Sequence, residues 1–369
     1  MKKKTLVFHP IIAPYRIDLF NAISEHYDAR FILYWRNLKD QTFDYAKIEE
    51  QMSFKPVYYI KEEMGTWRWL KTMWREIYSS KPDCVLVPEL GVLTIMTIIH
   101  RMLTFGKYKI VCMTDDSYNI LSDDNHFTKR HKKAINIMAP FIDEFINVEP
   151  RSAKWYQQRF GKGLYFPIIA EDNAARERLK RVLPISEQYI NQYGLQGKKI
   201  LLFVGRLVDF KNIDFAIKAF VKANIEDSVF VIIGSGNKEG ELKKLAAKYD
   251  NVYLAGRFEG DELYAWYNVG QVFTLPSRLE PFGAVTNEAL VAGCQCLISC
   301  NAGSNCLVNN GVNGYVIDPR DENVFIHYLS LLMDEVSPIR LPLSVRPTLM
   351  ISTFKEEVTK LFDRIDALI

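Results

Sequence analysis

The chain has 369 residues, of which 48% are hydrophobic and 25% are charged. This composition excludes a disordered or fibrous protein, and the length suits two domains of roughly 150–200 residues each. The longest apolar stretch, 92–99, is followed by His100-Arg101 and is far shorter than the roughly 20 residues of a membrane span. The apolar run at the N-terminus is too short for a signal peptide, so we expect a cytoplasmic protein.

The charge is unevenly distributed along the chain. The formal net charge is +3, but residues 1–170 carry 25 Lys and Arg against 19 Asp and Glu, whereas the remainder carries more acids than bases. This excess is too small to indicate a nucleic-acid partner, although it would favour an anionic membrane surface or an anionic acceptor. The six cysteines lack the C-x-x-C spacing of a zinc site and fit small buried hydrophobes.

In the first half of the chain, short apolar runs alternate with helical patterns such as 16–26 and 67–78. This alternation is typical of a parallel, doubly wound sheet. The runs expected to be strands are "TLVF" (5–8), "ARFILYW" (29–35), "CVLVP" (84–88), "KIVCMT" (109–114), "EFINV" (144–148) and "LYFPII" (164–169).

The segment "TWRWLKTMWREIY", residues 66–78, predicts a helix with two stripes. Its apolar stripe is Trp67, Leu70, Trp74 and Ile77, and its basic stripe is Arg68, Lys71 and Arg75. Tryptophan beside Lys or Arg is typical of the headgroup region of a bilayer. The alternative is a domain helix that packs its aromatic face on the sheet.

The second half repeats the same alternation, and the predicted fold class is therefore α/β with two Rossmann-like domains. Its expected strands are 199–205, 228–234, 251–256, 271–276, 294–299 and 314–318. The charged segment "AEDNAARERLKRV" predicts a hinge near residue 170, which gives domains at 1–169 and 170–348. The tail, 349–369, is expected to be an amphipathic helix that packs back towards the first domain.

Ligands of such folds lie beyond the carboxyl ends of strands, and a cleft between two domains is the expected site. The strand at 200–205 ends at Gly205 and is followed by Arg206 and Lys211. Two cations at this place can clamp a diphosphate, Arg through its planar fork and Lys as a point charge. Two solvated surface cations are the alternative.

The stretch "QVFTLPSRLEPFGAVTNEALVAG", 271–293, predicts a strand, a loop and a helix. The amides of Phe282, Gly283 and Ala284 would then point out of the start of the helix, where a phosphate is stabilised. Glu288 could reach a ribose and Glu280 a second set of hydroxyls. A catalytic acid/base pair and two helix-capping carboxylates are the competing interpretations.

These motifs, together with "VIIGSGNKEGEL", "VYLAGRFEGDELYAWYNVG" and "NNGVNGYVID", resemble the donor domain of the retaining GT-B glycosyltransferases of family 4 over 199–320. Two glutamates separated by seven residues are the signature of that family. The resemblance implies two Rossmann-like domains that face a central cleft. It also implies a UDP- or GDP-linked sugar as donor, transferred with retention of configuration to a glycan or lipid-linked acceptor in surface polysaccharide synthesis.

Carried over by position, the resemblance implies that Arg206 and Lys211 hold the diphosphate, Glu288 the ribose, and Glu280 the donor sugar. Arg257 and Phe258 become candidates for contact with the nucleobase. Neither a metal ion nor another cofactor is implied.

For the first domain, the resemblance is restricted to the strand rhythm and to the run "HPIIAPYRIDLFNAI". Arg16 in that run is expected on the acceptor side. Many members have a His-Asp pair after the strand that here reads "KIVCMTDDSYN", and Asp116 is the expected substitute for the histidine. Two other classes of protein remain open, a two-lobed sugar-binding protein without catalysis and a sugar-nucleotide epimerase.

Overall fold

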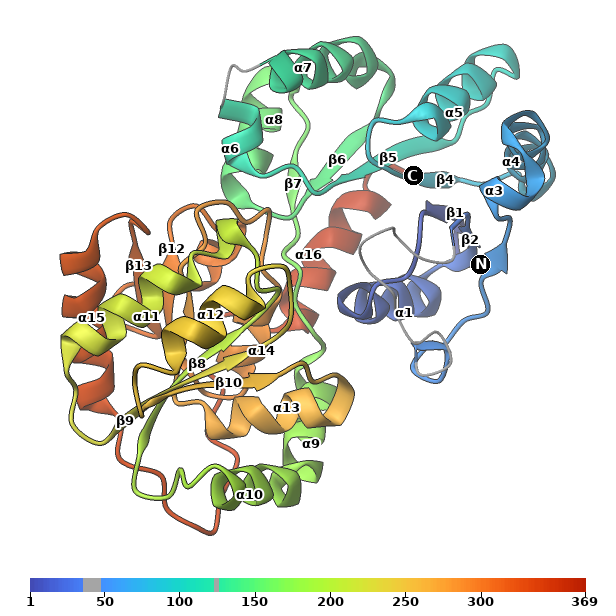
Figure 1. Cartoon of the computed structure of the whole chain (residues 1–369). Coiled ribbons are helices and arrows are strands. Elements are labelled where there is room, and N and C mark those ends of the chain that lie inside the picture. The colour runs from blue at the N-terminus through green and yellow to red at the C-terminus, as the bar shows by residue number, and fades with distance from the viewer. Residues whose placement is uncertain (36–47, 123–125) are drawn as a thin grey trace. The chain divides into compact units, whose positions relative to one another are not determined.

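The computed structural model describes residues 1–35, 48–122 and 126–369, and the chain divides into two compact units (Figure 1). Unit 1 comprises Met1–Ile168 with Lys355–Ile369, and unit 2 comprises Ile169–Phe354. Each unit has one sheet in which all described strands are parallel. The alternation of buried strands and amphipathic helices in the sequence predicted this architecture, and the prediction is confirmed.

The sheet of unit 1 has the strand order β3-β2-β1-β4-β5-β6-β7. From β1 the chain adds β2 and β3 towards one edge of the sheet. It then returns to the other side of β1 and adds β4 to β7 towards the opposite edge. The strands are β1 (Lys4–His9), β2 (Asp28–Leu33), β3 (Val57–Tyr58), β4 (Cys84–Pro88), β5 (Lys109–Thr114), β6 (Glu144–Asn147) and β7 (Leu164–Tyr165).

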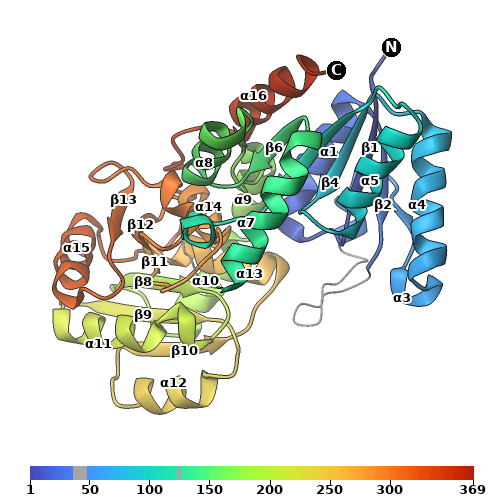
Figure 2. The same ribbon diagram turned by 90° about the horizontal axis from the view of Figure 1, so that it is seen from above.

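The helices of unit 1 cover both faces of this sheet. They are α1 (Ile17–His26), α3 (Lys61–Met64), α4 (Thr66–Ser80), α5 (Val92–Leu103), α6 (Tyr118–Ser122), α7 (His126–Met138), α8 (Pro150–Phe160) and α16 (Phe354–Asp366). One hydrophobic core joins α4, α5 and α7 to strand residues such as Phe8, Val85 and Ile110. These three helices therefore cover the same face of the sheet, and α5 lies between α7 and α4 (Figure 2).

The sheet of unit 2 has the order β10-β9-β8-β11-β12-β13. Its strands are β8 (Lys199–Val204), β9 (Ser228–Ile233), β10 (Val252–Gly256), β11 (Val272–Leu275), β12 (Gln295–Ser299) and β13 (Gly314–Ile317). Its helices pack in two groups. One group is α11 (Ile213–Ala223), α12 (Glu239–Ala246) and α15 (Glu322–Glu335), and the other is α9 (Asp172–Arg181), α10 (Leu183–Gln192), α13 (Gly260–Val269) and α14 (Val285–Val291).

One local prediction differs from the structure. The run 164–169 was expected to be one strand, but only Leu164–Tyr165 pairs with β6. Pro167 has no amide hydrogen for a ladder, and the chain leaves unit 1 at Ile168. The charged segment near residue 170 forms α9, whose start is capped because the Glu171 carboxylate accepts a hydrogen bond from the amide of Ala174 at 2.7 Å.

The orientation of α4 also differs from the prediction. Its buried face is formed by Trp69, Met73 and Ile77, whereas Trp67 is exposed on the opposite side. Trp74 is half-buried, with its ring 4.5 Å from that of His100. The predicted apolar stripe was wrong because it joined Trp67 to residues that pack on the sheet. The basic stripe of Arg68, Lys71 and Arg75 is exposed.

The helix α16 belongs to unit 1 although it follows unit 2 in the chain. Arg364 donates to Glu144 at 2.7 Å, and Tyr27 donates to Asp366 at 2.9 Å. The ring of Phe362 stacks on His26 at 4.4 Å. These contacts hold α16 against the segment around β6 and against the end of α1.

None of the helices in the described ranges combines the length and the apolar character that a membrane span requires.

Candidate active site

In each unit the direction of strand order reverses between two neighbouring strands. In unit 1 the reversal lies between β1 and β4, and in unit 2 between β8 and β11. A crevice opens at such a reversal because the loops on its two sides lead away from each other, and ligands of α/β folds bind there. The residues that follow these four strands are therefore the first candidates for a site.

In unit 2 the loops after β8 and β11 are tied together by polar contacts. Lys211, which is 7% exposed, forms an ion pair with the carboxylate of Glu280. The amide of Arg278 donates to the carbonyl of Phe210 at 2.8 Å, and its guanidinium donates to Asn212 at 3.0 Å. Two of the predicted site residues are thus brought into direct contact from positions 69 residues apart.

Glu280 is also held by the segment after β12. Its amide donates to the carbonyl of Asn301 at 3.2 Å, and its carbonyl accepts from the amide of Gly303 at 3.1 Å. Its carboxylate is therefore placed by three loops at once, those after β8, β11 and β12. A rigid carboxylate beside a lysine suits recognition of a polar ligand such as a sugar.

The backbone before α14 offers hydrogen-bond donors. In the part of the chain that the structure describes, no acceptor faces the amides of Phe282, Gly283 and Ala284. Gly283 adopts a φ of +93°, and a Cβ there would lie 2.6 Å from the Leu275 side chain. The turn therefore requires glycine, and its three successive amides are donors suited to an anion.

Glu288 lies in the first turn of α14, which has seven residues. One of its carboxylate oxygens accepts a hydrogen bond from the Tyr267 hydroxyl at 2.6 Å. Burial raises the pKa of Glu288, while the bond from Tyr267 and the charge of Arg178 oppose the rise. Tyr267 thus orients this carboxylate, a role that no spacing in the sequence indicated.

The remaining predicted residues of unit 2 are less enclosed. Arg206 is exposed, with its guanidinium 5.9 Å from the centre of the Phe210 ring. Arg257 is exposed and paired with Glu259. The ring of Phe258 packs 5.5 Å from that of Tyr189 and 5.8 Å from that of Trp266. Gly205 follows β8, and a Cβ on neighbouring Gly234 would lie 1.9 Å from its carbonyl oxygen, so this corner is closely packed.

Unit 1 gathers charged residues at its own reversal point. Arg16, which is 4% exposed, follows β1 and pairs with Asp115, which follows β5. His9, at the end of β1, has a pKa lowered to about 4 by burial and by the charge of Arg16, so its ring is neutral near pH 7. Arg16 therefore lies where a ligand of unit 1 would be bound.

Asp116 is buried and fully engaged by the protein. Its two carboxylate oxygens contact His131 and the Tyr156 hydroxyl, each at 2.7 Å. The bond to Asp116 is the main cause that raises the pKa of His131. The structure therefore brings His131 of α7 into contact with Asp116, the residue expected to take the place of the family's histidine.

Glu89 was also missed by the sequence analysis. It follows β4 directly, with a φ of +51° that is uncommon outside glycine. Although its side chain keeps contact with solvent, desolvation by the surrounding atoms, followed by the charges of Asp115 and Asp116, raises its pKa to about 7. A polar residue immediately after a buried strand was the available signal.

Both units have the Rossmann-like architecture of GT-B proteins, and solved structures of that class share the fold. One of them, HepE of Anabaena in complex with UDP and glucose, has a TM-score of 0.69 and 16% identity, with 99% of both chains covered. At this identity the similarity shows the fold alone.

Sequence relatives point to one family. Residues 186–339 match the model of the glycosyl transferases group 1. An uncharacterised glycosyltransferase of Methanocaldococcus jannaschii is 34% identical over 129 residues, which are 34% of this chain and 33% of the relative. The UDP-Gal:alpha-D-GlcNAc-diphosphoundecaprenol alpha-1,3-galactosyltransferase of Escherichia coli is 32% identical over 145 residues, 37% of each chain.

The chain thus spans about a third of the length of these curated relatives. The region 186–339, which matches the glycosyl transferases group 1, contains all the predicted donor-site residues.

Proposed function

We propose that the protein is a glycosyltransferase that takes a sugar from a UDP- or GDP-linked donor and transfers it, with retention of configuration, to a lipid-linked glycan acceptor. The observation that carries this proposal is the contact between Lys211 and Glu280 beside the free amides of residues 282–284. It combines a cation and amide donors for a diphosphate with a carboxylate for sugar hydroxyls, within the region that matches the family.

The donor half of the reaction depends on charge stabilisation. As the glycosidic bond breaks, negative charge grows on the leaving diphosphate, and Arg206, Lys211 and the three amides are the groups available to stabilise it. Glu288, held by Tyr267, has one oxygen left to accept from a ribose hydroxyl. In this scheme the positive field comes from the protein, and the reaction requires no metal ion.

The nature of the acceptor rests on the relatives and on unit 1. The E. coli relative is named for UDP-Gal as donor and for a sugar on diphosphoundecaprenol as acceptor. In unit 1, the cluster around Arg16, Glu89 and Asp115 supplies both a cation and carboxylates at the strand ends where an acceptor would bind. We extend the proposal to synthesis of surface polysaccharide.

The test is a screen followed by an assay. UDP, GDP and ADP, each with and without a sugar, are compared for the rise in melting temperature that they cause, because a ligand that binds only the folded state stabilises it. The best sugar nucleotide is then incubated with the protein, and release of the nucleoside diphosphate is followed. Stabilisation together with slow release supports the proposal. Retention is tested by the anomeric configuration of the linkage formed with an acceptor, because a free sugar loses its configuration by mutarotation.

Two outcomes would contradict it. Stabilisation without any release, even with polyprenyl-linked sugars added, indicates a binding protein. Conversion of the sugar nucleotide into an isomer, with the diphosphate intact, indicates an epimerase.

A further inference from the structure

The helix α5 presents an unusual surface. Its outer side and the loop after it expose six large apolar residues, between 44% and 90% of whose area is accessible. They are Val92, Ile95, Ile99, Met102, Leu103 and Phe105, and we call them the α5 apolar face. Exposed apolar residues scattered singly are ordinary, but a contiguous set marks an interaction surface.

The inner side of α5 shows that this exposure is specified by the sequence. Thr94 and Thr97 are fully buried, and their hydroxyls donate to the carbonyls of Glu89 at 2.6 Å and Leu93 at 2.9 Å. These hydroxyl residues share the buried side with Leu93, Met96 and Ile98, whereas Ile95 and Ile99 face outwards. A helix that served only to cover the sheet would carry polar rather than apolar residues on its outer side.

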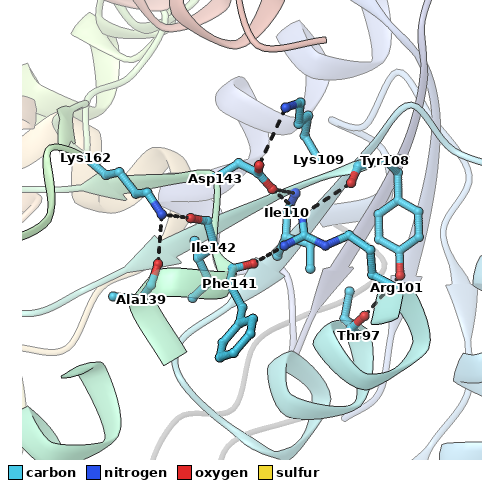
Figure 3. A network of polar contacts seen from close by, with 10 residues as sticks. All are labelled: Thr97, Arg101, Tyr108, Lys109, Ile110, Ala139, Phe141, Ile142, Asp143 and Lys162. Atoms are coloured by element: carbon cyan, nitrogen blue, oxygen red, sulfur yellow. Dashed lines mark hydrogen bonds and ion pairs between the residues drawn. The ribbon is translucent and has the colours of Figure 1, made fainter. Parts of the chain in front are cut away.

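Polar contacts at the end of α5 keep it in this orientation (Figure 3). Arg101 pairs with Asp143 and donates to the carbonyl of Phe141. The Tyr108 hydroxyl donates to the carbonyl of Thr97 at 3.0 Å. Rotation of α5 to bury its apolar face would break these contacts, so the face stays available on the surface.

Phe105 provides a second, independent observation. Its φ of +50° lies in the left-handed region, which a non-glycine residue adopts at a cost, and its ring is 90% exposed. The ring therefore contributes almost no packing to unit 1. An aromatic residue held at the tip of a strained turn, next to an apolar helix face, is suited to contact with something outside the molecule.

Charge identifies the partner. The helices α4, α5 and α7 together contain eight Lys and Arg residues and a single acid, Glu76, which is bonded to Arg30 and Tyr59. On α4 the exposed cations are Arg68, Lys71 and Arg75, and on α7 they include Lys129, Arg130 and Lys133. Because α5 lies between α4 and α7 (Figure 2), the helices on both sides of it carry exposed cations.

We propose that the α5 apolar face inserts into the interfacial region of an anionic membrane, with the cations of α4 and α7 on the lipid headgroups. An apolar strip flanked by cations matches the acyl boundary and the headgroup charge of such a surface. Pairing with a second copy of the chain is disfavoured because it would bring the two cationic flanks together. Membrane binding would bring the protein to the lipid-linked acceptor of the proposed function, but it is inferred from the surface of unit 1 alone.

The first experiment is flotation of the full chain with two kinds of vesicle. One contains phosphatidylcholine alone, and the other also contains about 30% of the anionic lipid phosphatidylglycerol. Binding should require the anionic lipid and fall as salt is raised. The variant Ile95→Ser/Ile99→Ser/Met102→Ser should bind at least about tenfold more weakly, since it removes apolar area from the inserted face. The matched control Val312→Ser/Leu331→Ser/Ile351→Ser changes exposed apolar residues of unit 2 and should bind as the wild type does.

Two further variants separate insertion from folding. Phe105→Gly removes the ring and relieves the positive φ, so it should bind vesicles several-fold more weakly while its melting temperature stays equal or rises. Lys71→Glu/Arg75→Glu should weaken binding on the order of tenfold. The control Lys244→Glu/Lys248→Glu, on exposed cations of unit 2, should not.

Three results would overturn the proposal: no binding of the wild type to anionic vesicles at low salt, unchanged binding of the triple serine variant, or a lower melting temperature of Phe105→Gly. A shift from dimer to monomer in the triple serine variant would instead assign the face to a second copy. Vesicle binding requires no donor, and donor hydrolysis requires no vesicle, so failure of one assay is distinguishable from failure of the other.

Discussion

The ion pair of Lys211 and Glu280 links two residues to which the donor proposal gives different tasks. We expect Lys211→Ala and Arg206→Ala each to lower release of nucleoside diphosphate on the order of 10²–10³-fold, because each removes charge that acts on the leaving group. Arg206 is exposed, so its loss should leave the melting temperature unchanged, whereas Lys211→Ala also strands the carboxylate of Glu280.

The double variant Lys211→Met/Glu280→Gln separates the two effects of Lys211, since it should regain stability without regaining turnover. Lys244→Ala, on an exposed cation far from β8 in sequence, is the control for a general change of charge. Normal turnover in both single variants would rule out the clamp.

The roles of Glu288 and Glu280 should be distinguishable by the ligand whose binding each substitution weakens. Glu288→Gln is expected to weaken binding of the bare nucleoside diphosphate about tenfold, because the ribose loses a charged acceptor and Tyr267 no longer donates to a carboxylate. Glu280→Gln should spare that ligand and weaken binding of the sugar-bearing donor. Calorimetric titration of each variant with both ligands is the measurement, and equal losses would contradict the division.

Glu89 predicts a pH dependence. Its pKa rises from 4.5 to about 7 on folding, so the folded state favours the protonated form. The stability that this group contributes is complete below pH 4.5 and is lost as the pH rises through 7. Glu89→Gln should therefore melt with the wild type near pH 4.5 and above it at pH 8. Glu50→Gln, on an exposed carboxylate, is the control, and a difference that is constant with pH would refute the assignment.

At the scale of elements, the turn between β11 and α14 depends on Gly283. A Cβ at this position would approach the Leu275 side chain to 2.6 Å and the Glu280 side chain to 3.2 Å, at a φ of +93°. We expect Gly283→Ala to destabilise the protein by about 1–3 kcal/mol and to weaken diphosphate binding by displacing the free amides.

The comparison for this change is Gly240→Ala in α12, where a new Cβ meets nothing within 4 Å. A helical glycine replaced by alanine should stabilise slightly, by about 0.5–1 kcal/mol. Denaturant unfolding of both variants decides the matter, and equal stability of the two would show that the turn tolerates a side chain.

At the scale of the whole molecule, the chain returns to unit 1 through α16. Glu144 is 1% exposed, and besides Arg364 its carboxylate accepts from the amides of Phe145 at 3.0 Å and Gly163 at 2.6 Å. We expect Arg364→Ala to lower the stability of unit 1 by about 1–3 kcal/mol, because a buried carboxylate loses its charged partner.

Lys355→Ala, on an exposed cation of the same helix, should have little effect. Calorimetry shows whether the two units unfold in one transition or in two. In Arg364→Ala, only the transition that includes unfolding of unit 1 should shift to lower temperature. A shift of the same size in both variants would mean that helix stability in general, not the contact with Glu144, is being measured.

Much of this protein was determined by local sequence. Buried strands of β-branched and aromatic residues alternate with amphipathic helices, and this pattern alone specified two parallel sheets. The loops "GRLVDFK" and "SRLEPFG" directly follow predicted strands in the chain. They therefore placed Arg206, Lys211 and Glu280 beyond the carboxyl ends of those strands. The family-like motifs then indicated the ligand class that we propose for unit 2.

Other features were decided only in three dimensions. Tyr267 on Glu288 and His131 on Asp116 join residues whose separation along the chain follows no fixed spacing. The outward face of α4 depended on a choice between Trp67 and Trp69, which are two positions apart, since both fit a helical period and only packing on the sheet distinguishes them. The apolar outer face of α5 was hidden for the same reason: a sequence records which residues are apolar, but the tertiary structure decides which of them the core has room to bury.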